Sequence, residues 1–138
     1  MDNYTCRLEL RIDWSEIDAF GHINNLSIMR YAQSARVGYL EKIGIMKMQA
    51  EQKKGPILAS ISCQFKKPLF YPGKVNVCTK VNVIKNTSFE LVHDIYDENN
   101  GLIAQAHDII VFYDFHNDSK LVIPQELRDL LEAGRIGK

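Results

Sequence analysis

A carboxylate, an imidazole, a glycine and two side-chain amides lie together in one short polar stretch near the N-terminus. The stretch is Asp18-Ala19-Phe20-Gly21-His22-Ile23-Asn24-Asn25, and a long helical pattern follows it directly. An unperturbed Asp has a pKa of about 3.9, so Asp18 is expected to be an anion at neutral pH that can act as a general base or a nucleophile. Gly21 allows close approach of the backbone to a ligand, and the first amides of a helix can bind an oxyanion. Acyl transfer needs this placement of groups.

Each of these residues also has a purely structural interpretation. Asp is common in turns, and a glycine turn often precedes an ordinary capped helix. For Asn24 the first interpretation is an N-cap, because Asn is among the best capping residues, although Asn24 and Asn25 could instead bond to a carbonyl. His22 could orient a substrate carbonyl, share a proton with the carboxylate, or be a plain loop histidine.

A second group of titratable residues lies further along the chain. The pairs His93-Asp94 and His107-Asp108 flank the loop Asn99-Asn100-Gly101, and simple register counting predicts that His93 and His107 are nearly opposite one another. A metal site would need a third ligand, and none is evident, so a solvated strand face is the favoured interpretation. We therefore expect no metal and no redox cofactor. Reduced packing thiols are the interpretation for Cys6, Cys63 and Cys78, which lack metal-type spacing.

Basic residues could supply a local cationic rim for phosphates. They are Lys66 and Lys67, together with Lys53, Lys54 and Arg36. The alternative is a solvated basic edge. Walker-type and dinucleotide glycine motifs are both absent from the sequence, so a bound nucleotide portion would be held by surface side chains.

The elements that must position these residues follow from the periodicity. Residues 7–12 alternate between polar and apolar side chains as a half-buried strand does. Apolar positions recur every three or four residues over 26–43, which predicts a helix of about five turns that stops near Gly44. Residues 47–54 are expected to form an exposed connection with a short helix, broken at Gly55-Pro56.

Four further segments are rich in Val, Ile, Phe and Tyr and are separated by short turns, which predicts antiparallel strands. A proline in a first turn marks a short terminal helix. The strands are expected at 57–65, 74–85, 88–96 and 102–114, and the helix at 124–132.

One strand, one long helix and a run of antiparallel strands indicate an α+β fold, with the sheet wrapped around or laid against the helix. One helix cannot cover both faces of such a sheet, so we expect a homo-oligomer. The 138 residues are 46% hydrophobic and 25% charged, which predicts one domain over 1–138. The net charge of zero favours neither nucleic acid nor a membrane surface. With no leader pattern and no run of about 18 apolar residues, the expectation is a cytoplasmic protein without a membrane span.

The ordered set of motifs resembles the hotdog-fold acyl-CoA thioesterases, specifically the 4-hydroxybenzoyl-CoA thioesterase-like family. The resemblance covers nearly the whole chain and rests on residues 18–25, 35–40 and 63–73 and on Ser88-Phe89. It implies an antiparallel sheet of about five strands wrapped around one long central helix. It also implies homodimers that pair their sheets edge to edge, often as homotetramers, with active sites at the dimer interface.

The resemblance assigns roles residue by residue. The family's catalytic carboxylate falls on Asp18, its oxyanion donor on the Asn25 amide, and His22 matches the histidine of a Gly-His-x-Asn-Asn branch. The sequence departs from the family at Glu16, where many relatives carry Asp. The His-x-Asn-Asn tail of its motif also differs from the aromatic-rich tail of the aroyl-CoA hydrolases. Substrate contacts are expected from Gly21, Asn24, Arg36, Lys66 and Lys67.

The implied activity is hydrolysis of an acyl-CoA or acyl-carrier-protein thioester, with Asp18 as nucleophile or general base. The alternative on the same fold is a non-catalytic module that binds acyl thioesters or serves in assembly. Hydration of an enoyl thioester is disfavoured, because the sequence lacks the Asp-to-His spacing expected of a hydratase.

Overall fold

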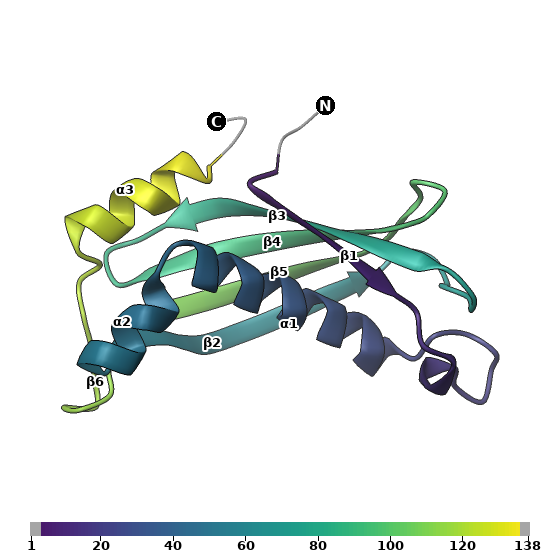
Figure 1. Cartoon of the computed structure of the whole chain (residues 1–138), viewed down its shortest axis with the longest axis horizontal. Helices are drawn as coiled ribbons and strands as arrows, with labels where there is room; N and C mark the ends of the chain where they lie inside the picture. The colour runs from purple at the N-terminus through teal and green to yellow at the C-terminus, as the bar shows by residue number, and fades with distance from the viewer. Residues whose placement is uncertain (1–3, 136–138) are drawn as a thin grey trace.

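The computed structural model describes residues 4–135, which form a curved antiparallel sheet with one long helix along its inner face (Figure 1). The strand order is β1-β3-β4-β5-β2, and the short β6 pairs with β5. The strands are β1 (Cys6–Arg11), β2 (Lys54–Phe65), β3 (Lys74–Ile84), β4 (Ser88–Asp97), β5 (Leu102–Asp114) and β6 (Ser119–Lys120). The helices are η1 (Trp14–Glu16), α1 (Asn25–Lys42), α2 (Ile45–Gln52) and α3 (Gln125–Ala133). The α+β class and the wrapped central helix are confirmed.

Helix α1 forms where the periodicity predicts it. Asn24 caps its first turn, and Ile28, Ala32, Ala35 and Tyr39 are buried against the sheet. Beyond its end, Gly44 adopts a φ of +83°, a conformation that favours glycine. No helix of the described residues is long and apolar enough to cross a membrane.

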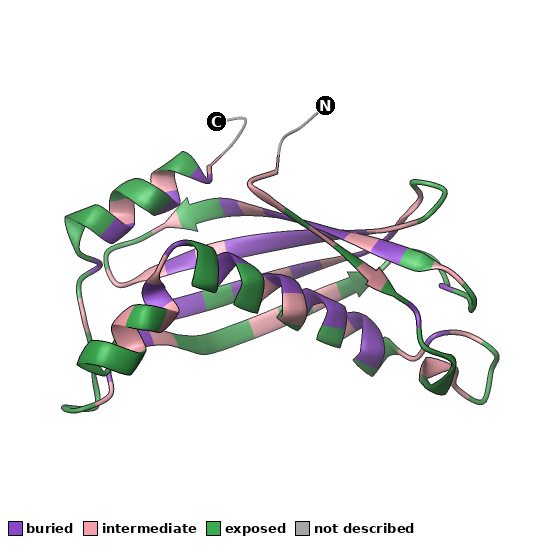
Figure 2. Cartoon of the chain, viewed as in Figure 1, coloured by how far each residue is buried: buried purple, intermediate pink, exposed green. Residues whose placement is uncertain are grey.

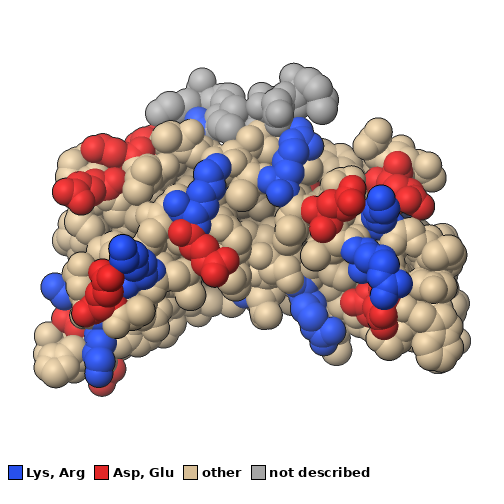
Figure 3. Space-filling view, viewed as in Figure 1, with Lys and Arg blue, Asp and Glu red and all other residues tan. Residues whose placement is uncertain are grey.

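The interior contains two apolar clusters, one under each half of α1. The first includes Ile28, Ala32 and Ala35, and the second includes Tyr39 and Leu40. Figure 2 shows buried residues on the helix and on the strands behind it. On the face seen in Figure 3, positive and negative side chains are interspersed, as the zero net charge suggests.

Two sequence expectations were wrong in detail. Gly55-Pro56 does not separate the helical connection from the next strand, because β2 already begins at Lys54 and continues through both residues. Proline is tolerated there since β2 is an edge strand of this sheet, paired with β5 alone. The polar segment after β5 also contains the two-residue β6.

Candidate active site

The polar stretch forms a compact loop between β1 and α1. Ile17 and Ile23 form an antiparallel bridge, and the Asp18 amide donates to the carbonyl of His22 at 2.7 Å. Gly21 closes the turn with a φ of +83°. The turn requires this left-handed conformation, which explains a glycine at that position.

Asp18 is held by one oxygen only. Its Oδ1 accepts hydrogen bonds from the amides of Phe20 at 2.8 Å and His22 at 3.2 Å. Among the described residues, Oδ2 has no hydrogen-bond partner. The loop therefore orients the carboxylate and leaves one oxygen available for chemistry.

The start of α1 supplies free backbone donors. Asn24 accepts the Ser27 amide on its side-chain Oδ1 at 2.8 Å, which confirms the capping interpretation. The Asn24 carbonyl accepts the amides of Ser27 and Ile28. The amides of Asn25 and Leu26 have no acceptor within residues 4–135, and they lie at the positive end of the helix dipole.

The carboxylate and the helix start share one pocket of about 420 Å³. Asp18, His22, Asn25, Lys66 and Lys67, all expected at the site, line it together. Gly21 and Asn24 do not line the pocket but form the turn and the cap beside it. The complete lining is Asp18, His22, Ile23, Asn25, Ile28, Phe65, Lys66, Lys67, Pro68 and Leu69.

Side chains around the pocket differ in how far they are engaged. The His22 ring packs edge-on against Phe70, with ring centroids 5.2 Å apart, and makes no hydrogen bond to a described residue. Lys67 forms an ion pair with Asp97, with 3.4 Å between Nζ and Oδ2. The Lys66 side chain is exposed and, among the described residues, bonds to Gln64 alone, at 3.3 Å. Lys66 is therefore the freer of the two cations at the rim.

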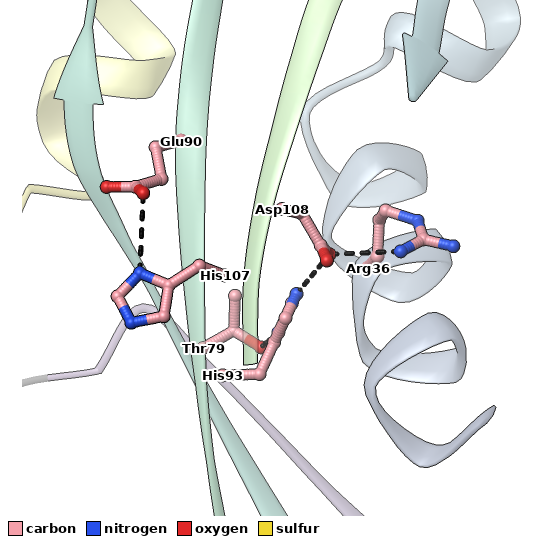
Figure 4. A network of polar contacts seen from close by, with 6 residues as sticks. All are labelled: Arg36, Thr79, Glu90, His93, His107 and Asp108. Atoms are coloured by element: carbon pink, nitrogen blue, oxygen red, sulfur yellow. Dashed lines mark hydrogen bonds and ion pairs between the residues drawn. The ribbon is translucent and has the colours of Figure 1, made fainter. Parts of the chain in front are cut away.

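Arg36 does not belong to this rim, so its assignment to a surface cationic group has to be corrected. Its side chain is 11% exposed, and Nη1 lies 3.1 Å from Oδ2 of the fully buried Asp108. The same Oδ2 lies 2.7 Å from Nε2 of His93, whose Nδ1 lies 2.8 Å from the Thr79 hydroxyl. Figure 4 shows this polar layer crossing from the sheet to α1. It separates the two apolar clusters of the interior.

The predicted arrangement of the two His-Asp pairs was also wrong. In the sheet, His93 pairs with Ala106 and Val92 pairs with His107. A shift of one residue reverses the face to which a side chain points, so the two histidines lie on opposite faces. His93 and Asp108 are completely buried, which rules out a solvated strand face for them. His107 lies on the other face, 3.3 Å from Glu90 (Figure 4). Within residues 4–135, no group of three or more His, Cys, Asp or Glu side chains is placed to hold a metal ion.

Two residues tied to the loop, Glu16 and Tyr31, were given no role at the site by the sequence analysis. Glu16 accepts a hydrogen bond from the buried Tyr31 hydroxyl at 2.8 Å. Glu16 also forms a capping box with Asp13 around η1. The Asp-x-x-Glu spacing is a known signal for such a box and could have identified Glu16. Its bond to Tyr31 depends on the fold and has no local signal.

Comparisons with known proteins agree with the resemblance noted in the sequence. Residues 12–131 match the family model of the thioesterase-like superfamily. An uncharacterized protein of Bacillus subtilis, YsmA, is 23% identical over 83 residues, which are 60% of this chain and 55% of that protein. The chain thus spans about half the length of this curated relative.

Solved structures share the fold at low sequence identity. The PA5185 protein from Pseudomonas aeruginosa superposes with a TM-score of 0.85 at 24% identity, covering 98% of this chain and 94% of that one. A DHNA-CoA thioesterase from Staphylococcus aureus superposes with a TM-score of 0.79 at 22% identity, covering 92% and 86%. A 1,4-dihydroxy-2-naphthoyl-CoA thioesterase from Synechocystis gives 0.79 at 16% identity, covering 91% and 93%.

Proposed function

This chain belongs to the thioesterase-like superfamily, and on that premise we propose that it is an acyl-CoA thioesterase, which hydrolyses an acyl-CoA or acyl-carrier-protein thioester to a free acid and a thiol. One observation carries the proposal: Asp18 and Asn25 line the same pocket, and among the described residues Asp18 Oδ2 and the Asn25 amide have no hydrogen-bond partner. A hydrolase for thioesters needs a base or nucleophile on one side of the carbonyl and a donor for its oxygen on the other.

In the proposed reaction the thioester oxygen accepts a hydrogen bond from the Asn25 amide, and the dipole of α1 stabilises the negative charge that develops there. Asp18 Oδ2 either attacks the carbonyl carbon or takes a proton from a water that attacks it. In the first route the C–S bond breaks to give an acyl anhydride of Asp18, which water then hydrolyses. In both routes the thiolate leaves with a proton that comes ultimately from water.

The pocket lining supports this class of substrate. Ile23, Ile28 and Leu69 offer apolar contacts to an acyl group, while Lys66 offers a cation to the phosphates of a carrier. The edge contact with Phe70 holds the His22 ring at the pocket, where it can contact the carbonyl or the leaving thiol.

We also propose that the chain assembles as a homodimer through β2, and that two dimers form a tetramer. β2 is twelve residues long and has one strand partner in the described chain, which leaves a long hydrogen-bonding edge. Ile57, Leu58 and Phe65 on this strand are exposed, and Phe65 also lines the pocket. Light scattering coupled to size exclusion tests this proposal, and a clean monomer at micromolar concentration would refute it.

The central test of function is Asp18→Asn with a panel of acyl-CoA esters and thiol release as the readout. We expect turnover to fall by about a hundredfold or more with the fold intact, because the base or nucleophile is lost. Glu9→Gln is the matched control, since Glu9 is exposed and lies outside the pocket. Near-normal hydrolysis by Asp18→Asn would remove Asp18 from catalysis.

Two further measurements distinguish nucleophilic attack from base catalysis, and an enzyme from a binding module. Single-turnover hydrolysis in ¹⁸O-labelled water separates the two routes, because label enters the Asp18 carboxyl only through an anhydride. Binding of every ester without thiol release by the unmodified protein would instead favour a non-catalytic acyl-thioester module.

A further inference from the structure

Glu16 is the residue at which several parts of the candidate site meet. Its side-chain Oε1 accepts the Asp13 amide at 2.8 Å and the Tyr31 hydroxyl at 2.8 Å. Its main-chain carbonyl accepts the amide of Asn24 at 2.9 Å and the Nδ2 of Asn24 at 3.0 Å. Glu16 is therefore bonded to the start of the loop, to its end and to helix α1.

The bonds inside the loop do not by themselves fix its position on the helix. Those around Asp18 run between neighbours, from the amides of Phe20 and His22. Two hydrogen bonds of the described loop reach outward instead: the Ile23 amide donates to the carbonyl of Leu69, and Glu16 accepts the Tyr31 hydroxyl. The second contact joins the loop to the same helix that supplies the oxyanion donor.

Tyr31 is a buried hydrogen-bond donor that keeps its proton. The residue is 4% exposed and lies six residues after Asn25 in α1, about 9 Å along the helix axis. Burial, and then the hydrogen bond to Glu16, raise the pKa of Tyr31 well above its usual value. The hydroxyl therefore keeps its proton over the whole pH range in which the protein would work. Tyr31 does not line the pocket and does not touch a substrate there.

We propose that Glu16 and Tyr31 are positioning residues, which hold the Asp18 carboxylate at a fixed distance from the Asn25 amide. The inference rests on the proposed function, because it concerns the geometry of that reaction. Nucleophile and oxyanion donor come from different elements, and a displacement of about 1 Å between such groups can cost on the order of a hundredfold in rate. The Glu16–Tyr31 hydrogen bond, called the strut below, joins the loop to α1, and neither of its residues lines the pocket.

The chain offers a matched pair of variants on one helix. Tyr31→Phe removes the hydroxyl that bonds to Glu16. Tyr39→Phe removes another buried hydroxyl of α1, one that has no hydrogen-bond partner in the described structure. A general effect of losing a tyrosine hydroxyl appears in both variants, whereas an effect of the strut appears in Tyr31→Phe alone.

We expect Tyr31→Phe to lower kcat by about tenfold to a hundredfold while KM changes less than about threefold, because the pocket lining is unaltered. Tyr39→Phe should retain both parameters. Glu16→Ala removes the acceptor of both side-chain bonds and should lower turnover. Glu16→Gln keeps an oxygen that accepts the same bonds and should retain most of the turnover of the unmodified protein. In the double variant Tyr31→Phe/Glu16→Ala, the two losses should not add, because both remove the same contact.

A readout that needs no substrate makes the inference testable whatever the activity. The amides of Phe20 and His22 should exchange their hydrogens faster in Tyr31→Phe, while the strand amides of β3 and β4 keep their protection. If the unmodified protein hydrolyses no ester, the proposed function fails and this exchange pattern still decides about the strut. Unchanged exchange in the loop, or equal loss of protection over the whole sheet, would overturn the positioning role.

Discussion

Replacing Asp108 by asparagine should cost the fold several kcal/mol, although the change removes only a charge. The variant keeps the shape of the side chain and an oxygen that can accept the His93 and Arg36 bonds. It leaves the Arg36 guanidinium, 11% exposed, without the carboxylate that lies 3.1 Å from it. A buried cation without its partner is the costly product of this substitution.

The size of the effect follows from burial. Asp108 and His93 are fully buried, so solvent screens their contacts little. Breaking such a pair from one side typically costs about 3 to 5 kcal/mol. Asp108 Oδ1 has no hydrogen-bond partner in the described residues, which lowers the net contribution of the carboxylate to the free energy of unfolding. We therefore expect a loss at the lower end of this range, about 3 kcal/mol. For a chain of this length, that loss corresponds to a fall in Tm of roughly 10 to 20 °C.

Urea unfolding followed by circular dichroism measures the loss, and Glu90→Gln is the control. Glu90 forms the other carboxylate–histidine contact, with His107, but that pair is partly exposed on the opposite face and should contribute less than about 1 kcal/mol. Adding Arg36→Met to Asp108→Asn should recover part of the stability, because the unpaired cation is gone. If Asp108→Asn unfolds within about 1 kcal/mol of the unmodified protein, the buried charges are not coupled as the distances imply.

Two further predictions concern the turns around the site. The hydrogen bond from the Gly101 amide lowers the pKa of Asp97 most, and the Asn99 amide and the charge of Lys67 lower it further. The stability that the Asp97 carboxylate contributes is therefore present above about pH 4 and is lost as pH falls through the folded-state pKa of Asp97. Asp97→Asn should therefore lower Tm at pH 7 and flatten the fall in Tm between pH 5 and pH 3, roughly; an unchanged Tm–pH profile would contradict this. Gly21→Ala should cost about 1 to 2 kcal/mol in urea unfolding through its φ of +83° alone, because an added Cβ meets nothing within 4 Å. Gly38→Ala in α1, with equally open space, should instead gain up to about 1 kcal/mol; equal effects of the two changes would show that backbone conformation is not the cause.

The sequence predicted the elements well where a local pattern decides them. The apolar spacing predicted α1 to within one residue at each end, because every buried position is three or four residues from another. β2 was misplaced at its start because Gly55-Pro56 has strong turn chemistry. That preference lost to tertiary context, since proline's missing donor costs little on an edge strand.

Predictions across strands were less secure, since register depends on details of the turn. The expectation was that His93 and His107 lie nearly opposite one another, and a shift of one residue in register places them on opposite faces of the sheet instead. The same step takes His93 from a solvated face into the interior, next to Asp108 and Arg36. Charge patterns along the chain gave no sign of this, because the three residues come from three separate elements.

The candidate site shows the same difference between features fixed by local sequence and features fixed by the fold. Asp18, Gly21 and Asn24 lie within seven residues, and bonds between near neighbours fix the carboxylate, the turn and the cap, so their types and spacing were informative. Tyr31 lies fifteen residues from Glu16, and a tyrosine inside an apolar helical stripe has an ordinary packing explanation. Its hydroxyl acquires a role only when the fold brings it to a carboxylate that the capping box has already oriented. Groups that bear chemistry can thus be found from local sequence, whereas the contact that sets their separation needs the folded chain.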